Sequence, residues 1–178
     1  MDKTLNWTEA IARVITLDTF GNVWFWAAVV VSWAVACHWL IGVPFDMLVR
    51  ARRGGAQEMQ DLEALVDINV RRIMWFQQIA GAGSAAFAAF FLAGFGLLAI
   101  GYRFELAIGA LVLGVPLTGV AILNLLLAQS LHREPVQGAE LLARMFKVRI
   151  WTQVLAAISL FFTAVFGMAY NIEAMYFL

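Results

Sequence analysis

The sequence predicts an all-α fold: an integral membrane four-helix bundle with an N-terminal interfacial helix and cytoplasmic helical extensions. The first observation behind this prediction is composition, because 63% of the 178 residues are apolar and only 13% are charged. An ordinary soluble domain is about 45–50% apolar and about 25% charged. The second observation is that the apolar residues gather in four long stretches. Together they exclude a disordered chain and a typical water-soluble enzyme.

The predicted membrane spans are residues 23–49, 73–101, 106–128 and 150–170. Each holds the roughly 20 mostly apolar residues that a helix needs to cross a bilayer. Helices are expected because lipid offers no hydrogen-bond partner to an unpaired backbone group. Only residues 102–105 separate the second span from the third, so these two helices are expected to be antiparallel neighbours. The whole chain, 1–178, then forms one membrane domain.

Residues 1–20 precede the first span and are predicted to form a short interfacial helix on the outer membrane surface. Apolar residues recur there at near-helical spacing: Leu5, Ile11, Val14 and Ile15. Asn6 and Glu9, three positions apart, fit the capping pattern that begins many helices. An amphipathic helix of this kind lies in the interface rather than crossing it.

Basic residues define the expected orientation. Nine of the twelve Lys and Arg fall in the connections 50–72 and 132–149, and only Lys3, Arg13 and Arg103 lie on the opposite side. Because cytoplasmic loops carry an excess of Lys and Arg, both long connections are expected in the cytoplasm and both termini outside. Twelve acidic residues balance the basic ones, so no overall positive field attracts a nucleic acid.

The connection before the second span carries a heptad-like apolar stripe that leads into it: Met59, Leu62, Val66, Ile73 and Phe76. Asn69 interrupts this stripe and is either an amide that sets the register against a partner helix or a ligand contact. A matching stripe leads into the fourth span: Leu141, Leu142, Met145 and Phe146. The two extensions are expected to pack together; the alternative is that each lies flat on anionic lipid. Acidic residues on the other face of the first stripe favour packing.

Small residues recur at four-residue steps in the second span: Gly81, Ala85, Ala89 and Ala93. In lipid, no hydrophobic force holds helices together, so small side chains that let backbones approach are the usual packing device. This row therefore predicts a helix-packing face. This face packs either against the third span, in a helical hairpin within one chain, or against a second subunit.

Four polar residues at or near the spans are candidate functional groups. His38 is expected near the middle of the first span, as an imidazole hydrogen-bonded inside the bundle or as a ligand, proton or pH-sensing group. Asp46 precedes Arg50 by four positions, which favours a local ion pair that ends the span. Gln77 and Asn124 lie toward the cytoplasmic ends of their spans and either bond across helices or line a wet cavity.

No cofactor, metal site or catalytic residue is predicted. The single cysteine, Cys37, excludes an internal disulfide framework and a self-contained iron–sulfur cluster. The two histidines, His38 and His132, are expected at different depths, which argues against a haem held by both. No phosphate-binding glycine loop, nucleophile elbow or paired-histidine zinc motif is present in the sequence.

The first half of the chain contains three adjoining stretches: residues 38–46 (HWLIGVPFD), residues 50–55 (RARRGG) and an acidic helix at 61–72. Together they resemble a family of small alphaproteobacterial-type inner-membrane proteins described as components of the SufBCD complex. The resemblance covers the first two spans and extends to the rest by layout. It implies location in the bacterial inner membrane and an association with cytoplasmic iron–sulfur assembly machinery, reached through the cytoplasmic helices.

The layout also resembles the glutathione-using membrane enzymes of eicosanoid metabolism. Those enzymes carry an Arg-x-x-x-Asn-x-x-Glu pattern, whereas here Leu65 and Arg72 flank Asn69 at the corresponding positions. The favoured interpretation is a non-enzymatic accessory or assembly protein that self-associates or docks a partner through its cytoplasmic helices. A homo-oligomeric ion channel or transporter subunit is the alternative, and a glutathione-using enzyme is a minor one.

Overall fold

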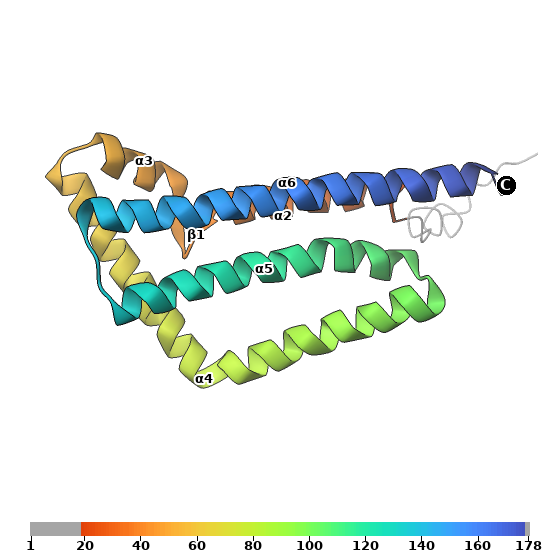
Figure 1. Ribbon diagram of the computed structural model, residues 1–178, viewed down its shortest axis with the longest axis horizontal. Helices are drawn as coiled ribbons and strands as arrows, with labels where there is room; N and C mark the ends of the chain where they lie inside the picture. The colour runs from red at the N-terminus through yellow and green to blue at the C-terminus, as the bar shows by residue number, and fades with distance from the viewer. Residues whose placement is uncertain (1–18, 177–178) are drawn as a thin grey trace, which may run out of the picture.

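The computed structural model describes residues 19–176, apart from the side chains of residues 171 and 173–176. The elements are α2 (Val23–His38), β1 (Trp39–Leu40), β2 (Val43–Pro44), α3 (Phe45–Arg53), α4 (Ala56–Tyr102), α5 (Glu105–Arg133) and α6 (Gly138–Tyr176), as Figure 1 shows. The all-α prediction is confirmed for these residues. The predicted interfacial helix at 1–20 lies almost wholly outside the described residues.

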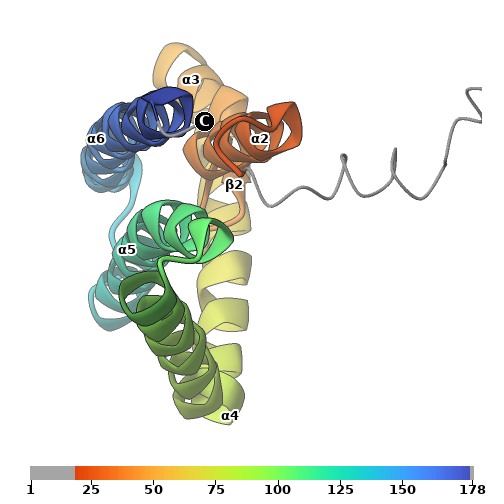
Figure 2. The ribbon, with the colours of Figure 1, turned by 90° about the vertical axis from the view of Figure 1, so that its right-hand side faces the viewer.

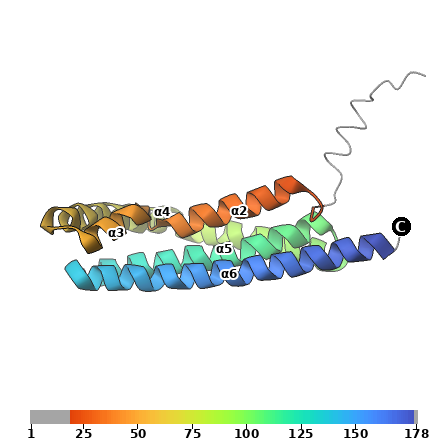
Figure 3. The same ribbon diagram turned by 90° about the horizontal axis from the view of Figure 1, so that it is seen from above.

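The long helices run side by side along the molecule. α5 packs between α4 and α6, and α2 packs on α6 and α5 (Figure 2). α4 bends near its middle: its first half crosses the ends of the other helices, and its second half returns beside α5 (Figure 1). Figure 3 shows α2 and α3 following one another along the same flank of α6. Because the second half of α4 lies beside α5 and away from α2 and α6, it is the outermost segment of this arrangement (Figure 2).

Three helices, α4, α5 and α6, are long and apolar enough to cross a membrane. α2 is also apolar but has only 16 residues, which at about 1.5 Å per residue is short of the roughly 30 Å hydrocarbon core of a bilayer.

The prediction of one continuous helix over 23–49 is wrong. α2 ends at His38, and β1 and β2 form a small antiparallel hairpin in which Leu40 pairs with Val43. The chain then turns into α3. Ile41 and Gly42 both have positive φ, the signature of a two-residue hairpin turn, and Pro44 has no N–H to continue a helix.

A hydrophobic cluster fills the end of the molecule where α4 begins. We call it the extension cluster, and its buried members on the three long helices are Leu62, Val66, Val70, Leu127, Ala128, Leu131, Leu141 and Met145. Residues of the hairpin and of α3 complete it. The two predicted extensions therefore contribute to one common cluster, which they share with α5, the hairpin and α3. A second cluster joins α2, α5 and α6 through Val29, Trp33, Val120 and Ala156.

A proline inside α5 is accommodated by its neighbour α6. Pro116 has no N–H, so the helix leaves the carbonyl of Val112, four positions earlier, without its usual donor. The hydroxyl of Ser159 in α6 donates to that carbonyl at 3.4 Å. A side chain from another helix thus replaces the missing backbone bond, as apolar surroundings require.

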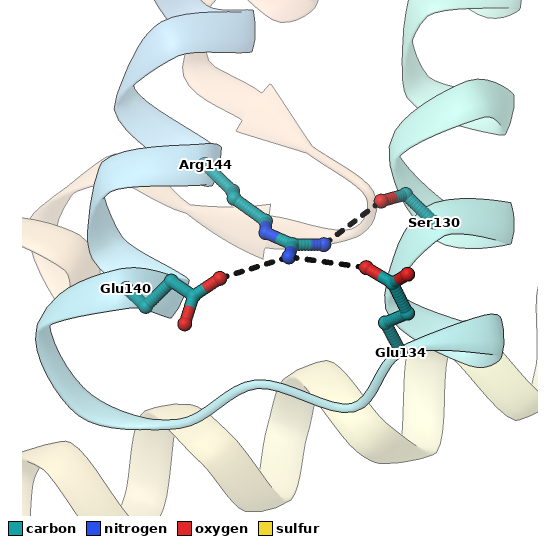
Figure 4. Close-up of polar contacts among 4 residues, drawn as sticks. All are labelled: Ser130, Glu134, Glu140 and Arg144. Carbon is teal, nitrogen blue, oxygen red and sulfur yellow. Dashed lines mark hydrogen bonds and ion pairs between the residues drawn. The ribbon is translucent and has the colours of Figure 1, made fainter.

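A guanidinium ties the end of α5 to the start of α6 (Figure 4). Arg144 donates to the hydroxyl of Ser130 at 3.0 Å, to Glu134 at 3.4 Å and to Glu140 at 2.8 Å. The hydrogen bond with Glu140 raises the pKa of Arg144 above its already high ordinary value, so this cation keeps its charge at every physiological pH. On the other side of the same connection, Glu63 of α4 accepts from the N–H of Gly138 at 2.7 Å.

Candidate functional site

The tip of the β1–β2 hairpin is held between α4 and α5 by two asparagine side chains. The backbone N–H of Ile41 donates to Asn124 Oδ1 at 2.8 Å. Asn69 Nδ2 donates to the carbonyl of Gly42 at 3.4 Å. Asn124 is fixed in turn by its own bond to the Val120 carbonyl, at 2.9 Å. We call Ile41, Gly42 and these two asparagines the hairpin junction.

The Asn124 contact matters because Ile41 is buried, and a buried backbone N–H without a hydrogen-bond partner costs free energy. Gly42 is exposed, so the bond between its carbonyl and Asn69 adds to the hold on the turn. Ile41 adds strain, since its φ is 45° and left-handed geometry costs a non-glycine residue about 1–2 kcal/mol. Its side chain is 4% exposed and belongs to the extension cluster. Burial and the hydrogen bond that Ile41 donates to Asn124 together keep this strained turn in place.

Asn69 also explains why glycine stands at position 42. A Cβ added there would lie 3.2 Å from the Asn69 amide, and φ is +77°. Asn69 itself is only 5% exposed. The prediction that Asn69 sets a register against a partner helix is wrong, because its amide donates to the carbonyl of Gly42 in the hairpin.

Arg149 closes the junction from α6. Its Nη1 donates to the carbonyl of Cys37, in the last turn of α2, at 3.0 Å. Its guanidinium carbon lies 3.4 Å from the centre of the Phe45 ring. Carbonyls at a helix C-terminus carry partial negative charge, so this cation stabilises the early end of α2. From the sequence, Arg149 was used only as evidence for the orientation of the chain. The available clue to its contact was Pro44, which indicates that the span ends early and that carbonyls at its end need donors.

His38 lies elsewhere than predicted. It is the last residue of α2, and its side chain is exposed rather than enclosed in the middle of a span. Its imidazole meets the Trp39 ring edge-on, with 5.8 Å between centroids. The expected interior position required a helix that continued to residue 49, and the hairpin removes it.

The predicted pair of Asp46 and Arg50 forms, with 3.2 Å between Arg50 Nη2 and Asp46 Oδ2. Both side chains are more than 60% exposed. The pair lies within α3 and does not end a membrane span. Its exposure and its i,i+4 geometry make it a local helix contact.

Gln77 and the row of small residues lie in α4. The Gln77 side chain covers Gly81, where an added Cβ would meet it at 2.8 Å. Gly81 is buried, but the other three residues of the predicted packing face, Ala85, Ala89 and Ala93, are exposed. The α4–α5 contact uses a neighbouring stripe that includes Leu92, whose methyl Cδ2 would lie 3.6 Å from a Cβ at position 114. Among the residues that the structure describes, therefore, most of the predicted face has no helix against it.

The four candidate polar residues are not brought together. Asn124 belongs to the hairpin junction, and His38, Asp46 and Gln77 lie apart from it. In the part of the chain that the structure describes, no group of three or more His, Cys, Asp and Glu side chains could hold a metal ion. A small cleft of about 130 Å³ between α4 and the α5–α6 connection contains Glu63 and Asp67, and both carboxylates already have partners within the chain.

Comparison with known proteins adds no relative: no family model matches the chain, and no match is found among curated proteins or solved structures.

Proposed function

We propose that this protein is a non-enzymatic accessory or assembly protein of the bacterial inner membrane that self-associates through the second half of α4. The observation that carries the proposal is the exposure of that half-helix. In the most apolar 18-residue stretch of α4, no residue is buried. In the corresponding stretches of α5 and α6, 17% and 28% of the residues are buried. The second half of α4 is thus the most exposed of the three long apolar segments. It is also the segment that carries the row of small residues predicted to form a helix-packing face.

The composition of the exposed surface supports a helix as its partner. Ala85, Ala89 and Ala93 are exposed, and an added Cβ at Gly83 or Gly94 would meet nothing within 4 Å. Large side chains are the ordinary covering of a lipid-facing helix, whereas small ones let a second helix approach closely. The same row on a second copy offers the same surface, so a symmetric pair satisfies both.

The end of the molecule that holds the extension cluster also carries the proposed docking surface for a partner. In the proposed orientation, with both termini outside, this end of the molecule faces the cytoplasm. The first half of α4 presents exposed acidic side chains there, at Glu58, Asp61 and Asp67. A cytoplasmic protein with a basic surface is the complementary partner, and iron–sulfur assembly machinery is the class that the sequence resemblance suggests.

An accessory role is preferred to a channel because of where the polar groups lie. A channel lined by His38, Gln77 or Asn124 needs these side chains along one wet path. The Asn124 amide is engaged by Ile41 and Val120, and the His38 side chain lies at the end of α2. An enzyme near Asn69 is disfavoured in the same way, because this side chain is buried against Gly42.

Cysteine cross-linking tests self-association. In a Cys37→Ser background, which removes the only cysteine, Ala89→Cys should give a disulfide-linked dimer when native membranes are oxidised. The matched control is Ala157→Cys, an exposed alanine in α6, which should remain monomeric. Equal cross-linking at both positions, or none at either together with a monomeric mass in detergent, would contradict self-association through α4.

A further inference from the structure

α3 and α6 exchange two cation–π contacts along a common seam. Arg149 of α6 lies over Phe45 of α3, at 3.4 Å, and Arg52 of α3 lies over Phe146 of α6, at 5.4 Å. Phe146 and Arg149 are three positions apart, so they share a face of α6. Phe45 and Arg52 are seven apart, so they share a face of α3. We call these four residues the α3–α6 seam.

Neither guanidinium in the seam has a carboxylate partner among the described residues. The ion pairs found there use Arg50, Arg71 and Arg144. A guanidinium has five N–H donors in its plane, and the Cys37 carbonyl accepts from one N–H of Arg149. Stacking on Phe45 uses the face of the group and leaves the other in-plane donors available. The seam is thus a positive site with unused donors.

The depth of the seam identifies the anion that reaches it. Arg149 directly precedes the apolar run at 150–170, so it lies where the hydrocarbon core ends. Phe146, which Arg52 covers, is four residues before Ile150, or about 6 Å further out along the helix. The headgroup layer occupies roughly 5–7 Å on each side of the core. In the proposed membrane crossing, both guanidiniums therefore lie at the level of lipid phosphates.

We infer that the α3–α6 seam binds anionic phospholipid, with the guanidiniums of Arg149 and Arg52 as its contacts to lipid phosphates. Arginine is suited to this role because its planar donors match a phosphate in two-point contacts. Basic pockets between helices at a membrane surface bind anionic headgroups in this way. The inference rests on the membrane crossing in the proposed function, and it does not require self-association.

Native mass spectrometry of the full chain in detergent tests the site, read on the monomer peak. The protein is titrated with phosphatidylglycerol and with phosphatidylcholine of the same acyl chains. Phosphatidylglycerol should bind in preference, and Arg52→Gln should weaken it about fivefold, the effect of one arginine near anionic lipid. Arg50→Gln removes the same charge from the same helix at a residue paired with Asp46, and should change binding less than about twofold.

Arg149→Lys separates geometry from charge. Lysine keeps the positive charge but loses the planar donors and the stacking on Phe45, so the preference for phosphatidylglycerol should fall although net charge is unchanged. Equal binding of the two lipids, or equal losses in Arg50→Gln and Arg52→Gln, would overturn the site. Displacement of the lipid by excess inorganic phosphate would also overturn it, in favour of a free-anion site. Failure of the chain to partition into membranes would instead remove the proposed function.

Discussion

Removing the Asn124 amide should release the hairpin from the helices. In Asn124→Ala the N–H of Ile41 loses its 2.8 Å partner, and a buried donor left unsatisfied costs about 1–3 kcal/mol. The left-handed φ of Ile41 stores a further 1–2 kcal/mol, approximately, that opening of the turn relieves. The strain is present in both proteins, so the lost bond to Asn124 alone sets the amount by which the variant lowers the free energy of hairpin opening.

Hydrogen exchange of the amides in residues 39–44 measures this opening in detergent or nanodiscs. A loss of 1–3 kcal/mol corresponds to exchange that is about 5 to 150 times faster. The control is Gln129→Ala, which removes a half-buried amide from the same helix without a hydrogen bond to the hairpin. Unchanged protection of residues 39–44 in Asn124→Ala would refute the reasoning, because the turn would then be held by packing alone.

Two further substitutions test the surroundings of the hairpin and of the proline. Gly42→Ala adds a Cβ at 3.2 Å from the Asn69 amide at a φ of +77°, so the thermal midpoint of the variant in detergent should fall. Gly101→Ala is the control: its Cβ meets nothing within 4 Å and alanine suits a helix better than glycine, so the midpoint should not fall. Ser159→Ala leaves the carbonyl of Val112, one turn before Pro116, without a donor and should destabilise the chain by about 0.6 kcal/mol. In a Pro116→Ala background the backbone N–H returns, so the same serine substitution should cost less; equal costs in both backgrounds would show that the serine does not replace the lost bond.

Sequence reasoning succeeded where the deciding interactions are local. Hydropathy over about 20 residues depends only on neighbours in the chain, and it located α4, α5 and α6 as helices able to cross a membrane. The i,i+4 spacing of Asp46 and Arg50 was also sufficient to predict their contact. The apolar stripes of the two extensions predicted the extension cluster, because a helix with an apolar face must bury it against another element.

Sequence reasoning failed where one long apolar run contains the end of one helix and the start of another. Residues 23–49 read as one span by hydropathy, yet Gly42 and Pro44 end the helix and turn the chain. This error moved His38 from an exposed helix end to an imagined interior position. It also hid the carbonyl of Cys37 that Arg149 binds, so Arg149 was counted only as a positive charge.

The amino-acid sequence by itself determined that the chain is helical, how long its apolar helices are and which helix carries small residues, because these properties follow from composition and period along a single segment. Only the tertiary structure decided which groups meet. Ile41 and Asn124 are 83 positions apart, and Cys37 and Arg149 are 112 apart. Bonds over such separations depend on which helices lie side by side and at what height. No local pattern records that, so the hairpin junction and the α3–α6 seam became visible only in three dimensions.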